Sequence, residues 1–409
     1  MLRQICELIP THEVAKLARE TGVEDQARTF TAWDHVVAML HAQLSHARSL
    51  NEVCDALKLQ RTALAAIRGA RPPARNTLSH ANRERDAALA ERLFWAMLEH
   101  LQSTFPRFGR AAGKRKLGWR FRRAIHVVDS TTIQLVANCL DWAKHRRRKA
   151  AAKCHLRLDL GSFLPSFALV EAAGPHDNAY ARELCAGLHE GEIALFDKAY
   201  VDFAHLHHLT QRGIWWVSRA KEDLSYRVTR RLPASSDPRI LADKVIVPTG
   251  ARSAAGYPGV LRRVCARLEV DGEEREMVFL TNNLAWAASS VVDLYGCRWA
   301  IETFFKELKQ TVQLVDFLGH NANAVKWQVW TALLVHLLLR FLAWQSQWAH
   351  SFSRLVAYVR AALWLVRELY ELLRRCGTAG GHFHWLGSPE QSWLPGFGPP
   401  AVGQQPCSA

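Results

Sequence analysis

The sequence predicts a protein of mixed α and β structure, in the α+β or α/β class, with a sheet between helical ends. Apolar residues recur at helical spacing throughout residues 1–105, and residues 325–376 are helical again and rich in Leu and Trp. Between these parts, short apolar runs alternate with amphipathic segments. The chain has 409 residues, 49% of them hydrophobic and 22% charged, which is typical of a globular protein with a sizeable core.

The first 105 residues are predicted to form a helical domain. Thr31 is placed to cap a helix in TFTAWDHVVAMLHAQL, and Ser49 and Glu52 have the spacing of a capping box. Residues 77–101 are predicted as one long helix. Basic side chains between the helices suit a DNA-binding bundle, and a helical packing domain without a ligand is the alternative. Residues 106–123 form a basic connector that either follows a phosphate backbone or is a solvated linker.

The middle of the chain is predicted to contain three strands, a helix, a strand, a helix and a strand, in that order. The apolar run in residues 124–135 is a strand that reaches Asp129, and the run in residues 191–200 is a strand that ends at Asp197. Residues 154–174 alternate like a hairpin with a turn near Gly161. Polar groups at the ends of buried strands lie at the sheet rim, where α/β sites form.

The stretch LYGCRWAIETFFKELKQ, residues 294–310, is predicted as one amphipathic helix with functional groups in a row. At 100° per residue, four side chains fall within an arc of about 60°: Tyr295, Arg298, Glu302 and Lys309. The opposite side is apolar and should face the core; it carries Leu294, Ile301, Phe304, Phe305 and Leu308. The alternative for the polar row is an ordinary solvated face with ion pairs between successive turns.

Three acids on these elements suggest a chemistry. In-line cleavage of a phosphodiester needs stabilisation of the attacking and leaving oxygens, which two Mg²⁺ ions about 4 Å apart can provide. Mg²⁺ prefers hard oxygen ligands, so Asp129, Asp197 and Glu302 would suffice. Without metal, three acids brought together would repel and raise at least one pKa. Acids on the first strand, the fourth strand and the last helix are the arrangement of a ribonuclease H-like core.

The charge and cysteine content narrow the class of partner. Lys and Arg number 53 against 38 Asp and Glu, a formal charge of +15, which favours nucleic acid over a membrane. The nine cysteines are scattered without zinc-site spacing, so a reduced, cytoplasmic setting is expected. Residues 329–344 are strongly apolar, but the run is under 18 residues and contains His336 and Arg340. A buried helix is therefore predicted there in place of a membrane span.

A family resemblance rests on these motifs. The spacing Y-x2-R-x3-E-x6-K from Tyr295 to Lys309 resembles the signature of the insertion-sequence-four family of bacterial DDE transposases. HVVDST resembles the family's first Asp segment, LFDKAYVDF its second, and TNN followed by LYGCRWAIETFFKELK its third. AQLSHARSLNEVCDAL and TLSHANRERD resemble a helical domain of one branch. The resemblance covers roughly residues 1–345.

The resemblance implies roles for the residues that carry it. Asp129, Asp197 and Glu302 would be catalytic and would bind two Mg²⁺ ions, with Mn²⁺ able to substitute. Tyr295, Arg298 and Lys309 would hold DNA phosphates or a distorted base near the cleaved end. Stacking on a flipped base is one interpretation of Trp286 and core packing the other, whereas Trp299 is expected in the core.

The resemblance also implies an activity and a domain organisation. The protein would bind the terminal inverted repeats of an insertion sequence as a homodimer, cleave DNA and transfer the strand to target DNA on the bacterial nucleoid. The alternatives are an inactive relic that only binds DNA and a metal-dependent nuclease without strand transfer. The predicted parts are a DNA-binding domain (1–105), a connector (106–123), a catalytic core (124–221 and 282–324) and a strand-rich insertion within that core (222–281). C-terminal helices (325–376) and a disordered Gly/Pro-rich tail (377–409) follow.

Overall fold

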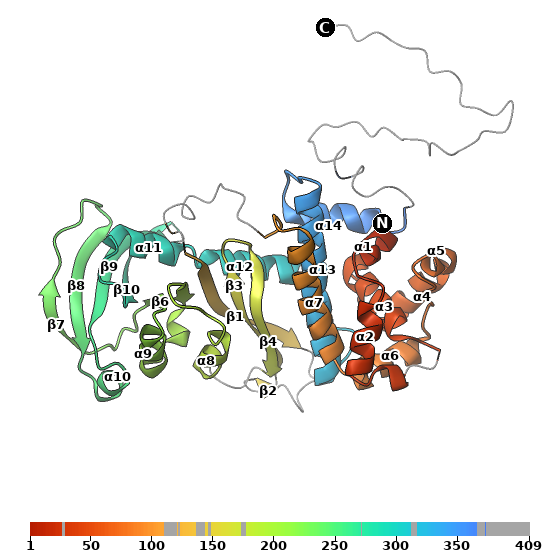
Figure 1. Ribbon diagram of the computed structural model, residues 1–409, viewed down its shortest axis with the longest axis horizontal. Helices are drawn as coiled ribbons and strands as arrows, with labels where there is room; N and C mark the ends of the chain where they lie inside the picture. The colour runs from red at the N-terminus through yellow and green to blue at the C-terminus, as the bar shows by residue number, and fades with distance from the viewer. Residues whose placement is uncertain are drawn as a thin grey trace, which may run out of the picture.

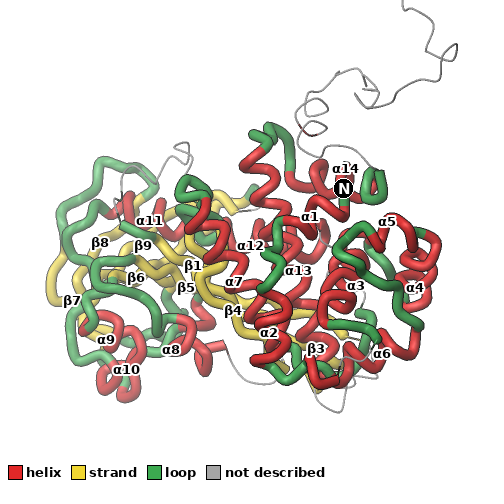
Figure 2. The backbone as a smooth tube through the Cα atoms, turned by 45° about the vertical axis from the view of Figure 1, so that its right-hand side comes forward, coloured by secondary structure: helices red, strands yellow, loops and turns green. Residues whose placement is uncertain are grey.

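A computed structural model shows strands at one end of the molecule and helices at the other (Figures 1 and 2). The structure describes residues 1–26, 29–109, 121, 123–135, 144–145, 149–172, 177–270, 272–311, 317–365 and 373. Most of the predicted connector and the whole predicted tail lie outside these ranges.

One large mixed sheet contains every strand that the described residues form. Its order is β2-β3-β1-β5-β6-β10-β9-β8-β7, with β4 paired to β3. The bounds are β1 (Ile125–Leu135), β2 (Lys144–His145), β3 (Lys149–Asp159), β4 (Leu164–Ala172), β5 (Ile193–Phe196), β6 (Trp215–Arg219), β7 (Tyr226–Arg231), β8 (Ile240–Pro248), β9 (Leu261–Val270) and β10 (Glu273–Thr281). The first three long strands are antiparallel, whereas β5 and β6 run parallel to β1.

The predicted order of strands and helices in the middle of the chain is therefore confirmed. The hairpin of β3 and β4 turns at residues 160–163, and α8 (Ala181–Leu184) and α9 (Phe203–Gln211) precede and follow β5. The four strands β7 to β10 fall between residues 222 and 281, and they extend the same sheet because β10 pairs antiparallel with β6.

The two faces of the sheet are covered by different helices. Val128 and Phe196 pack with residues of α8 and α9 on one face. Val127 and Leu195 belong to the core on the opposite face, together with Leu294 and other apolar residues of α11 (Ala288–Gly296) and α12 (Trp299–Lys306). Successive side chains of a strand point to opposite faces. The residues that follow Val128 and Phe196 therefore face α11 and α12.

The described residues of the N-terminal part form helices and no strand, as predicted. The α-helices are α1 (Leu2–Glu7), α2 (Glu13–Glu20), α3 (Ala32–Ser45), α4 (Leu50–Leu59), α5 (Arg61–Ala65), α6 (Arg75–Glu84) and α7 (Ala88–Thr104). Thr31 caps α3 in a full capping box with Asp34, and the Ser49 hydroxyl accepts a hydrogen bond from the Glu52 amide at the start of α4.

The prediction of one helix over residues 77–101 is wrong, because the chain breaks between α6 and α7. Arg85 takes an extended conformation, and its buried guanidinium donates to the carbonyls of Phe30 and Thr31. The Asp86 carboxylate then accepts a hydrogen bond from the Ala88 amide at 2.9 Å. A tertiary contact and a new cap therefore override helical propensity.

The C-terminal helices complete the helical end. The long helix α13 (Ala322–Gln345) packs against α3, α6 and α7, and α14 (Phe352–Ala361) packs against α13 and α3. The Met1 amino group donates to the Leu365 carbonyl at 2.8 Å, so the start of the chain lies against residues after α14. By length and composition α13 could cross a membrane, but 83% of its most apolar window is buried inside the protein. It is therefore placed as a core helix, as predicted.

Candidate active site

Asp129 and Asp197 lie on neighbouring strands at one edge of the parallel part of the sheet. The last parallel pair of β1 and β5 joins Val128 to Phe196, and the two aspartates are the next residues on each strand. Both point to the face covered by α11 and α12, by the alternation described above. β1 itself continues to Leu135, so Asp129 lies within a strand and does not end one as predicted. The parallel pairing ends there, which brings the two carboxylates side by side.

Glu302 lies in the first turn of α12, which packs against β1. The prediction of one regular helix over residues 294–310 is wrong in its detail. Around Gly296–Arg298 the chain tightens into i to i+3 hydrogen bonds, including Arg298 N to Tyr295 O at 2.9 Å and Ile301 N to Arg298 O at 3.1 Å. At Glu307–Thr311 it widens into a π-helical segment. The apolar side is buried as predicted, with Leu294, Ile301, Phe304, Phe305 and Leu308 all at 6% exposure or less.

Arg298 connects the acids. Its guanidinium donates to the Asp129 carboxylate at 2.9 Å and to the Glu302 carboxylate at 2.5 Å. The Arg298 side chain is only 12% exposed, so these charge-assisted bonds are well shielded from water. The Arg298 Nε is buried and has no hydrogen-bond partner among the described residues. One donor of this cation is therefore available to another acceptor.

Tyr295 and Lys309 reach the same strands. The Tyr295 hydroxyl lies 3.5 Å from the Asp197 carboxylate, at the limit of a hydrogen bond, and the Asp197 carboxylate also accepts from the Lys198 amide at 2.7 Å. The Lys309 ammonium donates to the Thr132 carbonyl of β1 at 2.6 Å. The segment thus brings Tyr295, Arg298 and Glu302 to Asp129 and Asp197, whereas Lys309 contacts β1 further along, at Thr132. The role of the Thr132 carbonyl in positioning Lys309 had no signal in the sequence, because any residue supplies a carbonyl.

The electrostatics reflect this crowding. The pKa of Asp129 is raised to about 6, mainly by burial; the Ser130 amide and Arg298 oppose this rise, and the charges of Asp197 and Glu302 add to it. Burial alone would lower the pKa of Arg298, but its contacts with Tyr295, Asp129 and Glu302 raise it overall. Burial also lowers the pKa of Lys309. Burial is thus the largest single influence on the charged groups of the site.

The donor set fits a hard divalent cation. Asp129, Asp197 and Glu302 offer only carboxylate oxygens, the ligands that Mg²⁺ prefers. Among the described residues, however, no three Asp, Glu, His or Cys side chains stand close enough together to hold an ion as they are. The Arg298 guanidinium occupies the space between Asp129 and Glu302, and it would have to release a carboxylate for metal to bind.

The structure shows different environments for the two tryptophans. Trp286 is partly buried, and its ring contacts those of Phe121 and Trp215 at centroid distances of 5.5 and 5.9 Å. This is packing of the kind that the core interpretation describes. Trp299 was expected in the core, and this is wrong, since it is 55% exposed at the start of α12. At 100° per residue, Trp299 lies on the side of the helix away from the apolar residues, so its exposure follows from helical spacing.

Comparison with known proteins identifies relatives of this chain. A family model described as "Transposase DDE domain" matches residues 120–338, and one described as "Domain of unknown function (DUF4372)" matches residues 1–67. Protein y4zB of Sinorhizobium fredii, named as a transposase, is 28% identical over 274 residues, 66% of this chain and 72% of that protein. A probable transposase for insertion sequence element IS5377 of Geobacillus stearothermophilus is 24% identical over 350 residues, 83% of this chain and 84% of that protein.

One solved structure has a weak overall similarity to this chain. The piggyBac transposase in a synaptic complex with hairpin DNA aligns over 91% of this chain and 78% of that chain, with 12% identity and a TM-score of 0.42. A TM-score this low supports no correspondence of individual residues.

Proposed function

The chain belongs to the bacterial DDE transposases of insertion sequences, and we propose that it binds the terminal inverted repeats of its own element and both cleaves and joins DNA strands there. The observation that carries this proposal is the meeting of three acids and one arginine. Asp129 and Asp197 follow the paired residues Val128 and Phe196, and Arg298 joins Asp129 to Glu302.

The proposed catalytic core is ribonuclease H-like. Its support is the strand order β4-β3-β1-β5-β6, with three antiparallel strands followed by two that run parallel to the first. The parallel strands direct their carboxyl ends to one edge of the sheet, and Asp129 and Asp197 lie at that edge. The core would comprise residues 124–221 and 282–324, with residues 222–281 as an insertion.

Asp129, Asp197 and Glu302 would hold two Mg²⁺ ions, with Mn²⁺ able to substitute. Bound there, such ions would stabilise the attacking and leaving oxygens of the phosphodiester. Arg298 would then leave at least one carboxylate and turn its charge to a DNA phosphate. In the absence of DNA and metal, its two hydrogen bonds would offset part of the repulsion between Asp129 and Glu302 and so hold the site ready.

The remaining residues of the site would bind DNA. Arg298 can hold a phosphate oxygen through Nε and one terminal nitrogen together. Lys309 is fixed by Thr132 beside β1 and would contribute a point charge to a phosphate near Asp129. Tyr295 would orient Asp197 through its hydroxyl. Trp286 is packed against Phe121 and Trp215, and a stacking role would require it to leave that cluster.

The other parts of the chain would support this reaction. Residues 1–105 would bind the terminal repeats, residues 106–123 would follow the DNA backbone, and the helices of residues 325–376 would join the first domain to the core. We further propose a homodimer on two DNA ends, acting in the cytoplasm on nucleoid DNA.

The test is a strand-cleavage assay on a labelled duplex that carries the repeat sequences flanking the gene. Wild-type protein with Mg²⁺ should nick the duplex at the repeat end and, with target DNA added, yield a joined product. Cleavage without joining would identify a nuclease, and binding without cleavage would identify an inactive relic.

A further inference from the structure

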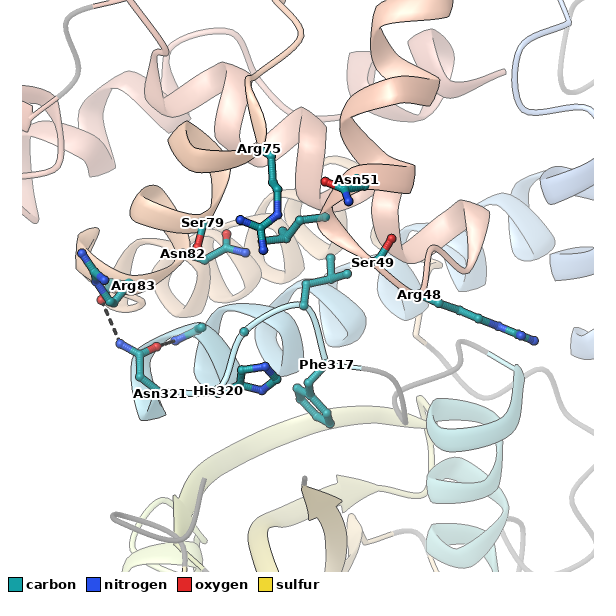
Figure 3. Close-up of a pocket in the computed structure, with 14 residues that line it drawn as sticks. Arg48, Ser49, Asn51, Arg75, Ser79, Asn82, Arg83, Phe317, His320 and Asn321 are labelled. Atoms are coloured by element: carbon teal, nitrogen blue, oxygen red, sulfur yellow. Dashed lines mark hydrogen bonds between the residues drawn. The ribbon is translucent and has the colours of Figure 1, made fainter. Parts of the chain in front are cut away.

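A second polar site lies at the helical end of the molecule, apart from the acids. It is a pocket of about 580 Å³ between the start of α4, one side of α6, and residues 317–321, which lead into α13 (Figure 3). Proteins bind small groups in pockets of about 300–1,000 Å³, so this volume suits part of a nucleotide.

The pocket is basic. Arg48, Arg75 and Arg83 line it, and no Asp or Glu is among its described lining residues. All three arginines are exposed. Arg48 and Arg75 form no ion pair with a carboxylate in the described part of the chain, whereas Arg83 pairs with Glu84 at 2.6 Å. Two positive charges are therefore uncompensated at the mouth of the pocket, and a third is partly offset.

Two helices begin at this pocket. Ser49 caps α4, a helix of 10 residues, and Asn321 caps α13, a helix of 24 residues, and both caps line the pocket. The first amides of a helix and its dipole favour an anion at the N-terminus. The walls are joined to each other, since the Asn321 amide donates to the Arg83 carbonyl at 3.2 Å (Figure 3) and Asn323 donates to the Asn82 carbonyl at 3.0 Å.

Asn82 supplies an unused buried donor. Asn82 is only 2% exposed, and its Oδ1 accepts a hydrogen bond from the His35 ring at 2.8 Å. This bond orients the amide, so Nδ2 is the end left over, and it has no partner among the described residues. Figure 3 shows Nδ2 directed into the space that the Arg75 guanidinium also enters. A buried donor without a partner is unfavourable, and an acceptor in the pocket would satisfy it.

We propose that this pocket binds a phosphate group of a nucleic-acid backbone. The phosphate oxygens would accept from Arg75 and the Asn82 side-chain amide at the start of α4 and α13. Arg48 extends away from these two residues in Figure 3, and its side chain would turn toward the phosphate on binding. The inference rests on the proposed function, because that function brings DNA to the chain. Beyond that function, the inference states that residues 317–321, which follow the candidate active-site segment, contact the same phosphate as the N-terminal helices.

The test measures DNA binding with no chemistry. Full-length protein in EDTA is titrated into a fluorescent repeat-end duplex at several salt concentrations, for wild type, Arg48→Gln, Arg75→Gln and the matched control Arg61→Gln. Arg61 is exposed at the start of α5 and does not line the pocket. Each pocket variant should bind about tenfold more weakly and lower the salt slope by about one unit, whereas Arg61→Gln should match wild type. Thermal melts of all four proteins check that they are folded.

A second arm separates DNA from free phosphate. Inorganic phosphate is added to the same proteins, and the shift in Tm is recorded. If the pocket prefers a DNA phosphate, millimolar inorganic phosphate should change the Tm only slightly. The duplex should still bind the pocket variants more weakly than the wild type and the control. If wild type binds DNA and all three variants lose the same amount of DNA affinity, the pocket has no special role and the inference is overturned.

Other outcomes also decide. Phosphate that raises the Tm of wild type but not of Arg75→Gln, with no DNA binding by any protein, would identify a free-anion site and overturn the nucleic-acid assignment. Pocket-dependent binding in EDTA combined with no cleavage in Mg²⁺ would support the inference while contradicting the proposed catalysis.

Discussion

Arg298 donates to the carboxylate of Asp129 at 2.9 Å, although 169 positions separate the two residues in the chain. The same guanidinium holds Glu302 one helical turn away. A cation thus stands between two acids that a DDE transposase would use for metal, and the two uses of these acids compete. This competition gives Arg298 a testable dual role, as a counter-charge in the free protein and as a phosphate contact on DNA.

Arg298→Gln should therefore strengthen metal binding in the absence of DNA and weaken DNA binding. Loss of two charge-assisted hydrogen bonds frees Asp129 and Glu302, so Mn²⁺ should bind about tenfold more tightly or better. Calorimetric titration with Mn²⁺ measures this without any activity assay.

Lys309→Ala serves as the control for Arg298→Gln. It also removes a positive charge from the segment that carries Glu302, but Lys309 contacts the Thr132 carbonyl and neither Asp129 nor Glu302. Its Mn²⁺ affinity should stay close to that of wild type. Equal gains in Mn²⁺ affinity for the two variants would mean that total charge, and not the hydrogen bonds of Arg298 to Asp129 and Glu302, governs metal binding.

Glu302→Gln should abolish cleavage and retain DNA binding. The amide keeps the shape of the side chain but removes a charge that holds metal, and loss of several kcal/mol of charge stabilisation slows cleavage by at least about 100-fold. DNA affinity should stay the same or increase, because one negative charge near phosphate is gone. Normal Mg²⁺-dependent cleavage by this variant would rule out Glu302 as a ligand.

The acids of the site could be predicted because alternation along a strand is regular. IHVV and IALF read as buried strands, and the residue after each had to lie on a defined face and at a common edge. The apolar side of the Glu302 helix was equally predictable, since a stripe at helical spacing must face a core.

The contacts between distant residues could not be predicted. The bridge from Arg298 to Asp129 depends on how α12 packs on β1, which no local pattern encodes. The tightened turn at Gly296–Arg298 and the π segment at Glu307–Thr311 follow from that packing too. The exposure of Trp299 does not depend on these irregularities, because regular helical spacing already places it opposite the apolar stripe. Between the two irregular turns, Ile301 and Phe304 are buried, as the helical pattern predicts.

Trp299→Ala should leave stability nearly unchanged, because the side chain is largely exposed. A change within about 0.5 kcal/mol in the free energy of unfolding is expected for such a surface position. The comparison is Trp216→Ala. Trp216 is fully buried and its indole donates to Thr210 at 3.0 Å, so that variant should lose about 3–5 kcal/mol. Urea titration of both variants measures the contrast. Comparable losses in the free energy of unfolding would show that Trp299 is part of the core.

The last prediction concerns acid stability at Glu307. Its carboxylate accepts from His336 at 3.0 Å and from Arg340. Burial raises the pKa of Glu307, but these two partners outweigh it and hold the pKa below the usual 4.5. Burial lowers the pKa of His336 below 6.5. In both cases the unfolded chain binds more protons than the folded chain, so acidification must destabilise the protein.

The pH window follows from these directions. Stability should begin to fall below pH 6.5 as His336 of the unfolded chain protonates, and fall again below pH 4.5 as Glu307 does. Glu307→Gln should cost about 1–3 kcal/mol at pH 7, where the charge is present in wild type. The difference from wild type should close as the pH drops through the depressed pKa of Glu307. Glu99→Gln, an exposed change on α7, is the control and should run parallel to wild type in urea titrations at each pH. A constant gap between Glu307→Gln and wild type from pH 7 to pH 3 would show that the carboxylate charge does not stabilise the fold.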